Sequence, residues 1–338
     1  MDAIYTVLAK LIINVENIVG SGVKGGLKKE IESGTKLVID RSMNKIYLKI
    51  KSKLNLNSFK RKFGKLDPDN PDLVKELSKT IEEVYYSDRE FRELVKEILS
   101  DREVKIWLFE ESTKRQIMDS EDLKYIPDLF GFGGSGGLPI EDFYVELSVS
   151  RKYFKDNISK PEEQNEKTEE TKTPDEVIEE SVKNNRNRII IFGVPGSGKT
   201  TLAKYYAVKL NREGKFRVVF YRKLRNYDGG DLKTFVFGKA DSDILDTIFV
   251  LRKTFDYLII LDGFDEVNPE YKQRLSEEIN KFPFFTVVTS RPISTYIKTD
   301  ERQIYEILPL KEKIAIKMAE KDRLLFEERW DESGHRKV

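Results

Sequence analysis

Apolar residues near the start of the chain recur every three or four positions, the spacing of a helix that buries one face. The repeat covers Ile4, Val7, Leu8, Leu11, Ile12, Val15 and Ile18. Such a stripe most often packs into a protein core, and a membrane-disrupting or partner-binding helix is the alternative. Polar residues interrupt the segment, which is therefore too short an apolar run to span a bilayer. They are Lys10, Asn14, Glu16 and Asn17.

Two further helices are expected to form a hairpin. Asn70 followed by Pro71 has the form of a helix start, with apolar residues at helical spacing after it. Ser87 and Glu90 stand at capping-box spacing before a third helix. Helices joined so closely bury facing stripes. We therefore predict a helical N-terminal domain over residues 1–128.

A change of composition separates this domain from the rest. The stretch from Phe130 to Leu138 contains five glycines, too many for the interior of a helix or strand. Asp142 to Ser150 is rich in β-forming residues, whereas Asp156 to Thr173 is a polar tract with little to bury, typical of an exposed loop. We assign residues 129–175 to a glycine-rich linker and polar loop.

Short apolar runs then alternate with helical stretches. Runs that are apolar at nearly every position indicate strands covered on both faces, so we predict an α/β fold with a parallel three-layer sheet. The candidate strands are Arg188–Phe192, Arg217–Tyr221, Tyr257–Leu261, Phe285–Thr289 and Tyr305–Leu308. This domain is predicted over residues 176–320, followed by a polar tail over 321–338.

Composition removes several kinds of chemistry. The chain has no cysteine and one histidine, which excludes disulfides and thiol nucleophiles and leaves little room for imidazole chemistry. The 60 Lys and Arg nearly balance the 59 Asp and Glu, for a net charge of +1, which argues against a chain that binds polyanions over its whole surface. With neither a spanning helix nor a signal peptide, we expect a cytoplasmic protein.

The segment GVPGSGKT, from Gly193 to Thr200, matches the pattern GxxxxGK[ST] between a predicted strand and a helical stretch. Because of this context, a phosphate-binding loop is a better interpretation than a chance glycine-rich turn. The glycines let amide N–H groups point inward, Lys199 supplies a charge for the β- and γ-phosphates, and the Thr200 hydroxyl is a ligand for Mg²⁺. The predicted binding residues are Gly193, Val194, Pro195, Gly196, Ser197, Gly198, Lys199, Thr200 and Thr201.

An acidic cluster and an arginine follow two later strands. Asp262 stands at a strand exit, where its carboxylate can face the phosphate loop and hold hydrated Mg²⁺. Asp265 and Glu266 follow, and one of them can polarise the attacking water. Arg291 ends the next apolar strand and can reach the γ-phosphate. A solvated acidic loop and a surface arginine are the alternatives.

Together these segments resemble the NACHT family of P-loop NTPases, within the STAND class of signal-transducing ATPases. The resemblance rests on GVPGSGKTT, LIILDGFDE and VVTSRP, with weaker agreement in FYVELSVS, RVVFYRKLR and YEILPL, and it covers roughly residues 140–320. It implies a five-stranded sheet of the AAA+ kind, ATP as the nucleotide, and self-association on activation. It also implies that Asp262, Asp265, Glu266 and Arg291 line the nucleotide site.

The resemblance leads to one functional hypothesis. We expect an ATP-binding and slowly hydrolysing signalling switch, with the N-terminal domain as effector or adaptor and an unknown activating ligand; a defence role would fit the family. An AAA+-like DNA-dependent ATPase, acting as motor or loader, is the alternative, and a module that keeps its nucleotide without turnover is a third possibility. Such proteins usually continue into winged-helix and sensor regions. The one histidine, His335, lies in a polar tail and does not match their nucleotide-sensing histidine.

A basic segment in the N-terminal domain is the remaining candidate. From Arg41 to Lys65 there are nine basic residues and no acidic one, with three aromatic residues between them. Nucleic acid or an anionic membrane surface would fit this composition. We favour a solvated face balanced by the acidic helices that follow.

Overall fold

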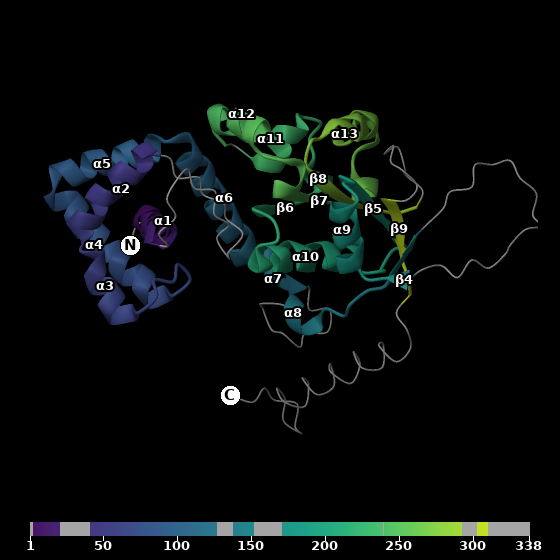
Figure 1. Ribbon diagram of the computed structural model, residues 1–338. Helices are drawn as coiled ribbons and strands as arrows, with labels where there is room; N and C mark the ends of the chain where they lie inside the picture. The colour runs from purple at the N-terminus through teal and green to yellow at the C-terminus, as the bar shows by residue number, and fades with distance from the viewer. Residues whose placement is uncertain are drawn as a thin grey trace, which may run out of the picture. The chain divides into compact units, whose positions relative to one another are not determined.

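The computed structural model divides into two compact units, one made of Met1–Ser112 with Asp241–Val250 and the other of Thr113–Ala240 with Leu251–Val338 (Figure 1). The predicted domain boundaries at residues 128 and 320, nearly all of the glycine-rich and polar stretches, and His335 lie outside the described residues. No helix within those residues is long and apolar enough to cross a membrane. The structure describes residues 3–20, 41–126, 138–151, 171–238, 240–292 and 303–309.

Helices build the first unit. They are α1 (Ala3–Gly20), α2 (Arg41–Leu54), α3 (Leu56–Phe63), α4 (Pro71–Ser87), α5 (Arg89–Ser100), most of α6 (Arg102–Asp119) and most of α12 (Ser242–Leu251). Leu8, Leu11, Ile12 and Val15 of the predicted apolar stripe do lie in the core, but every side chain from Leu11 to Glu16 is buried. α1 is therefore covered on more than one face, by α4 and α2 among others.

The predicted α4–α5 hairpin is confirmed, with one correction at its turn. Asn70 caps α4, its side chain accepting hydrogen bonds from the amides of Asp72 and Leu73. The cap of α5 is Asp88, whose Oδ1 accepts from the amide of Phe91 at 3.0 Å. Ser87 is the last residue of α4, so its helical backbone cannot take the extended conformation that an N-cap needs.

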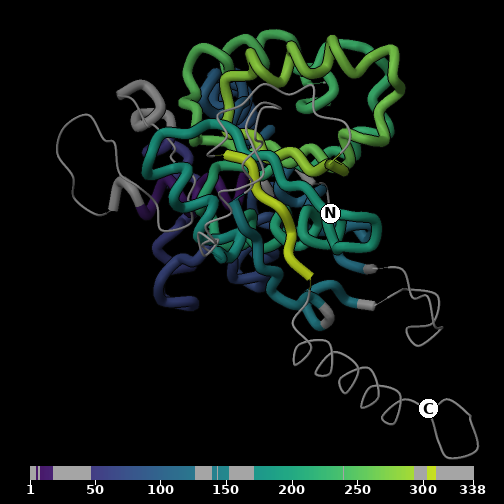
Figure 2. Tube along the Cα trace, turned by 90° about the vertical axis from the view of Figure 1, so that its right-hand side faces the viewer, coloured from purple at the N-terminus to yellow at the C-terminus, as the bar shows by residue number. Residues whose placement is uncertain are grey.

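The second unit contains a seven-stranded sheet with the order β4-β3-β9-β5-β8-β7-β6. Five neighbouring strands are parallel and match the predicted ones: β9 (Ile304–Ile307), β5 (Arg188–Phe192), β8 (Phe285–Ser290), β7 (Tyr257–Asp262) and β6 (Val218–Lys223). Two antiparallel strands that the family resemblance does not imply extend the β9 side: β3 (Val149–Arg151) and β4 (Thr171–Lys172). β9 is drawn in yellow in Figure 2.

Helices cover both faces of this sheet, as predicted (Figure 1). α10 (Lys199–Glu213) packs against β6, β7 and β8, whereas α11 (Leu232–Phe237) packs against β6 and against α13 (Pro269–Lys281). The unit also contains the short helix α7 (Glu121–Lys124) and an antiparallel pair of strands, β1 (Tyr125–Ile126) and β2 (Leu138–Pro139). Its described 3-10 turns are η2 (Leu224–Asn226), η3 (Thr254–Asp256) and η4 (Phe264–Glu266).

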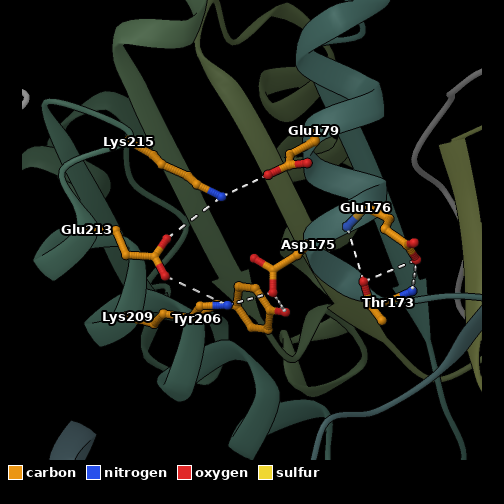
Figure 3. Close-up of polar contacts among 8 residues, drawn as sticks. All are labelled: Thr173, Asp175, Glu176, Glu179, Tyr206, Lys209, Glu213 and Lys215. Atoms are coloured by element: carbon orange, nitrogen blue, oxygen red, sulfur yellow. Dashed lines mark hydrogen bonds and ion pairs between the residues drawn. The ribbon is translucent and has the colours of Figure 1, made fainter.

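Two local features before the first parallel strand were not predicted. The segment from Asp142 to Ser150 is mostly not a strand, because α8 (Ile140–Phe143) takes its start and only its end pairs, in β3. The other feature is α9 (Pro174–Lys183), which begins directly after the polar tract. A capping box of Thr173 and Glu176 begins this helix (Figure 3).

Polar contacts fasten α9 to α10, the helix that follows the phosphate loop (Figure 3). The Oδ2 atom of Asp175 accepts from the Tyr206 hydroxyl at 2.8 Å and from Lys209 Nζ at 2.6 Å. Lys215 lies between Glu179 and Glu213, 2.9 Å and 3.8 Å from their carboxylates. Because α9 leads into β5, these contacts also hold the strand that carries the loop.

Candidate functional site

The predicted phosphate loop connects β5 to α10, in the strand–loop–helix context that the motif requires. β5 ends at Phe192 and α10 begins at Lys199. The amide of Gly193 donates to the carbonyl of Ser290 at 3.2 Å, which ties the loop to the end of β8. Parallel strands bring their carboxyl ends to the same sheet edge, so the residues that follow β5, β7 and β8 gather here.

Glycine is required at two loop positions for different reasons. A Cβ on Gly193 would lie 2.2 Å from Ser197 Oγ, closer than side chains approach. Gly198 has φ +87, in the left-handed region, and a Cβ there would lie 3.3 Å from Leu147 Cδ1. Of the other predicted binding residues, Val194, Pro195, Gly196 and Thr200 are exposed and Ser197 and Thr201 are half-buried.

Lys199 points its ammonium back at its own loop. Nζ donates to the carbonyl oxygens of Gly193 and Val194, at 2.7 Å and 3.0 Å. Burial lowers the pKa of Lys199; the nearby carboxylates of Asp265, Asp262 and Glu266 oppose the shift, and the Arg291 guanidinium adds to it. All four predicted charged residues therefore lie within electrostatic range of this ammonium.

Asp262 is the last residue of β7 and is 6 % exposed. Each of its carboxylate oxygens accepts a hydrogen bond from a neighbouring strand. Thr289 Oγ1 of β8 donates to Oδ1 at 2.6 Å, and the Tyr221 hydroxyl of β6 donates to Oδ2 at 3.1 Å. The Thr289 hydroxyl also accepts from the amide of Gly263 at 2.9 Å. The sequence reading did not find Tyr221 or Thr289.

Asp265 and Arg291 contact each other. Arg291 Nε lies 2.9 Å from Asp265 Oδ2, and the Arg291 amide donates to Oδ1 at 3.0 Å. Lys272 Nζ donates to the main-chain oxygen of Asp265 at 3.0 Å, which holds the η4 turn in place. Glu266 is exposed, at the end of that turn. The arginine is thus oriented by a carboxylate, and the other acid is open to solvent.

The family comparison agrees with this geometry. The family model for the NACHT domain matches residues 187–322. Residues 187–322 form a NACHT domain. This domain is a nucleotide-binding P-loop NTPase with the predicted α/β sheet. No curated protein matches the chain.

Among solved structures, the NACHT-containing chain is similar to a mutant of RuvB from Thermotoga maritima, at 15% identity and a TM-score of 0.29, covering 47% of this chain and 51% of RuvB. It is also similar to PCH-2 of C. elegans, at 18% identity and a TM-score of 0.31, covering 46% of this chain and 44% of PCH-2. The chain thus aligns with about half the length of each.

The donor groups of the NACHT domain suit Mg²⁺. Magnesium is usually held by one or two protein oxygens together with water and phosphate, not by a protein cage. Over the described residues, no group of three or more acidic or imidazole side chains forms such a cage. Asp262 offers a carboxylate that still has lone pairs beyond its two hydrogen bonds, and the exposed Thr200 offers a hydroxyl.

Proposed function

We propose that the NACHT domain binds ATP with Mg²⁺ and hydrolyses it slowly. The observation that carries this proposal is the position of Lys199, whose ammonium lies in the phosphate loop within electrostatic range of three carboxylates and Arg291. Amides of the loop and the start of α10 are suited to hold phosphate oxygens. A half-buried ammonium that donates to carbonyl oxygens gains by exchanging them for phosphate oxygens, which carry full charges.

Each charged side chain then has a distinct task. Asp262 and Thr200 would hold Mg²⁺, which neutralises phosphate charge when it is bound. Glu266, exposed beside the loop, accepts a proton from the attacking water or orients it, with Asp265 as the other candidate. Arg291 leaves Asp265 to contact the γ-phosphate, so its partner depends on whether ATP or ADP is present.

The proposed biological role is that of a signalling switch. The nucleotide state would control conformation and self-association, and the N-terminal helical unit would act as effector or adaptor, with defence signalling as one setting. Support comes from Lys199 and Arg291, which both have internal partners that a nucleotide would replace. A ligand that exchanges such contacts shifts the balance between two conformations.

The binding claim is tested with Lys199→Ala. We expect this variant to lose ATP binding in calorimetry, because the ammonium that compensates phosphate charge is gone. Lys183→Ala is the matched control, since Lys183 is exposed at the end of α9. Unchanged ATP affinity in Lys199→Ala would show that the nucleotide site is assigned wrongly.

The switch claim is tested by sizing the protein with ATP, with ADP and with a non-hydrolysable ATP analogue. We expect the ATP and analogue states to share an assembly state that differs from that of the ADP state. The same size under all three conditions would contradict the switch, while leaving nucleotide binding intact.

The DNA-dependent alternative gains no support from the basic segment. Lys51 and Lys60 pair with Glu16, Lys53 pairs with Asp88 and Glu90, and Lys62 pairs with Glu76. These lysines are balanced by acidic side chains, including those of the following helices α4 and α5, as predicted. Stimulation of ATP hydrolysis by DNA, with steep salt dependence, would favour the alternative.

A further inference from the structure

Tyr221 reaches the acidic end of β7 from the neighbouring edge strand. The parallel register pairs Tyr221 of β6 with Ile260 of β7. Side chains two residues apart on a strand share a face, so Asp262 lies on the same face as Ile260, one step further along. The length of the tyrosine ring carries its hydroxyl to Asp262 Oδ2, at 3.1 Å.

Burying the hydroxyl of Tyr221 costs free energy, so its presence at this site calls for a structural reason. The residue is 6 % exposed. A phenylalanine would fill the same space without a polar atom that needs a partner in the interior. The hydroxyl donates to Asp262 Oδ2 at 3.1 Å, so the buried phenol has a charged partner that accounts for it.

Two donors from opposite sides fix one carboxylate. β7 lies between β8 and β6 in the sheet. Thr289 of β8 holds Oδ1 at 2.6 Å and Tyr221 of β6 holds Oδ2 at 3.1 Å. With one oxygen held, the carboxylate can still turn about its Cβ–Cγ bond, and the second donor removes that freedom.

We propose that Tyr221 is a positioning residue that orients the Asp262 carboxylate toward the magnesium ion accompanying the nucleotide. This inference rests on the proposed function, because it takes Mg²⁺ as the ion that Asp262 holds. Tyr221 acts through Asp262, with which its hydroxyl is hydrogen-bonded. Its contribution is to hold Asp262 in the binding orientation before the ion arrives, which lowers the cost of binding.

The test uses Tyr221→Phe, which removes one oxygen and leaves the ring in place. Binding of a fluorescent ADP analogue is measured while Mg²⁺ is titrated, and again in EDTA. We expect the Mg²⁺ concentration that gives half of the increase in nucleotide binding to rise by about tenfold, the low end for the loss of one hydrogen bond to a charged group. Binding in EDTA should stay unchanged.

Tyr227→Phe is the matched control. Tyr227 is 4 % exposed and its hydroxyl donates to the carbonyl of Gly230, away from Asp262. This variant should keep the wild-type Mg²⁺ dependence. The proposal is overturned if Tyr221→Phe also keeps it. If the wild-type protein binds no nucleotide at all, the proposed function fails, and the next measurement still tests Tyr221.

That measurement is a thermal unfolding cycle without nucleotide or metal. Tyr221→Phe should lower Tm in the wild-type background, because a carboxylate loses a donor, and should not lower it in the Asp262→Ala background, where the acceptor is gone. An equal decrease in both backgrounds would show that the hydroxyl acts through some group other than Asp262, and would overturn the proposal.

Discussion

The carboxylate of Asp265 binds both the side chain and the main-chain amide of Arg291. The guanidinium Nε lies 2.9 Å from Asp265 Oδ2, and the main-chain amide of the arginine donates to Oδ1 at 3.0 Å. The arginine side chain is half exposed, at 51%, whereas that of Asp265 is 12% exposed. The carboxylate is therefore the fixed partner, and the guanidinium is the part that can turn toward a ligand.

Arg291→Ala should lower the affinity for ATP and leave the affinity for ADP unchanged. If the guanidinium reaches the γ-phosphate, we expect ATP affinity to fall by about tenfold, the value of one charge-assisted hydrogen bond, with ADP affinity unchanged. Competition against a fluorescent nucleotide measures both. Arg274→Ala, at an exposed position of α13, is the control. Equal losses for the two nucleotides would mean that Arg291 does not distinguish them.

Gly193→Ala should destabilise the phosphate loop through a specific clash. The added methyl group would meet Ser197 Oγ at 2.2 Å and Lys199 Cγ at 3.2 Å. We expect a loss of about 1–3 kcal/mol in the free energy of unfolding, typical of overpacking, together with weaker nucleotide binding. Urea unfolding measures the first.

Removing the clashing oxygen should return part of that loss. In Gly193→Ala combined with Ser197→Ala, the shortest contact is absent, although Ser197 Cβ, also at 3.2 Å, remains. A double variant no more stable than Gly193→Ala would show that the Ser197 hydroxyl oxygen does not set the requirement for glycine.

Local pattern was enough to predict the phosphate loop and most of the sheet. A buried strand, the GxxxxGK[ST] spacing and a following helix are consecutive in the sequence, so Lys199 and its loop could be placed without tertiary information. Tyr221 and Thr289 could not be assigned to Asp262, because their contacts depend on the register between strands that are distant in sequence. The turn at Ser87 shows a smaller limit. Ser87 and Asp88 are both residue types that cap helices. Only the backbone conformation shows that Asp88 is the N-cap of α5.

Glu16 should make the stability of the helical unit depend on pH. Its carboxylate is 1% exposed, and Oε1 accepts from Lys51 at 2.8 Å and from Lys60. Burial acts to raise the pKa of Glu16, but the two lysines outweigh it, and the folded-state pKa lies below the ordinary value of 4.5. The stabilisation is therefore present above pH 4.5 and is lost as the pH falls through the folded-state pKa.

Glu16→Gln should remove this dependence. At neutral pH we expect a loss of about 1–2 kcal/mol, less than for a fully buried pair because both lysines are partly exposed. Below the folded-state pKa the two proteins should converge. Urea unfolding in a Trp330→Phe background, where the fluorescence comes from Trp107 in the core of the unit, measures both. A constant difference at all pH values would show that Glu16 contributes by packing alone.

Asn211 closes the open edge of the sheet. β6 is the outermost strand, and the carboxamide of Asn211 on α10 pairs with Val219 as another strand would. Its Oδ1 accepts from the Val219 amide at 2.8 Å, and Nδ2 donates to the carbonyl oxygens of Val219 at 2.8 Å and Ala207 at 2.9 Å. A buried side chain thus satisfies backbone groups that have no neighbouring strand.

Asn211→Ala should cost about 2–4 kcal/mol in the free energy of unfolding, because buried groups lose their partners. Asn211→Asp should cost at least as much at neutral pH, since a carboxylate keeps the acceptor for the Val219 amide but faces two carbonyl oxygens with no proton to donate. Asn184→Ala, at an exposed site, is the control. Hydrogen exchange gives the deciding readout. The Val219 amide should lose protection in Asn211→Ala and keep more of it in Asn211→Asp, and equal protection in all variants would mean that Asn211 does not close the edge.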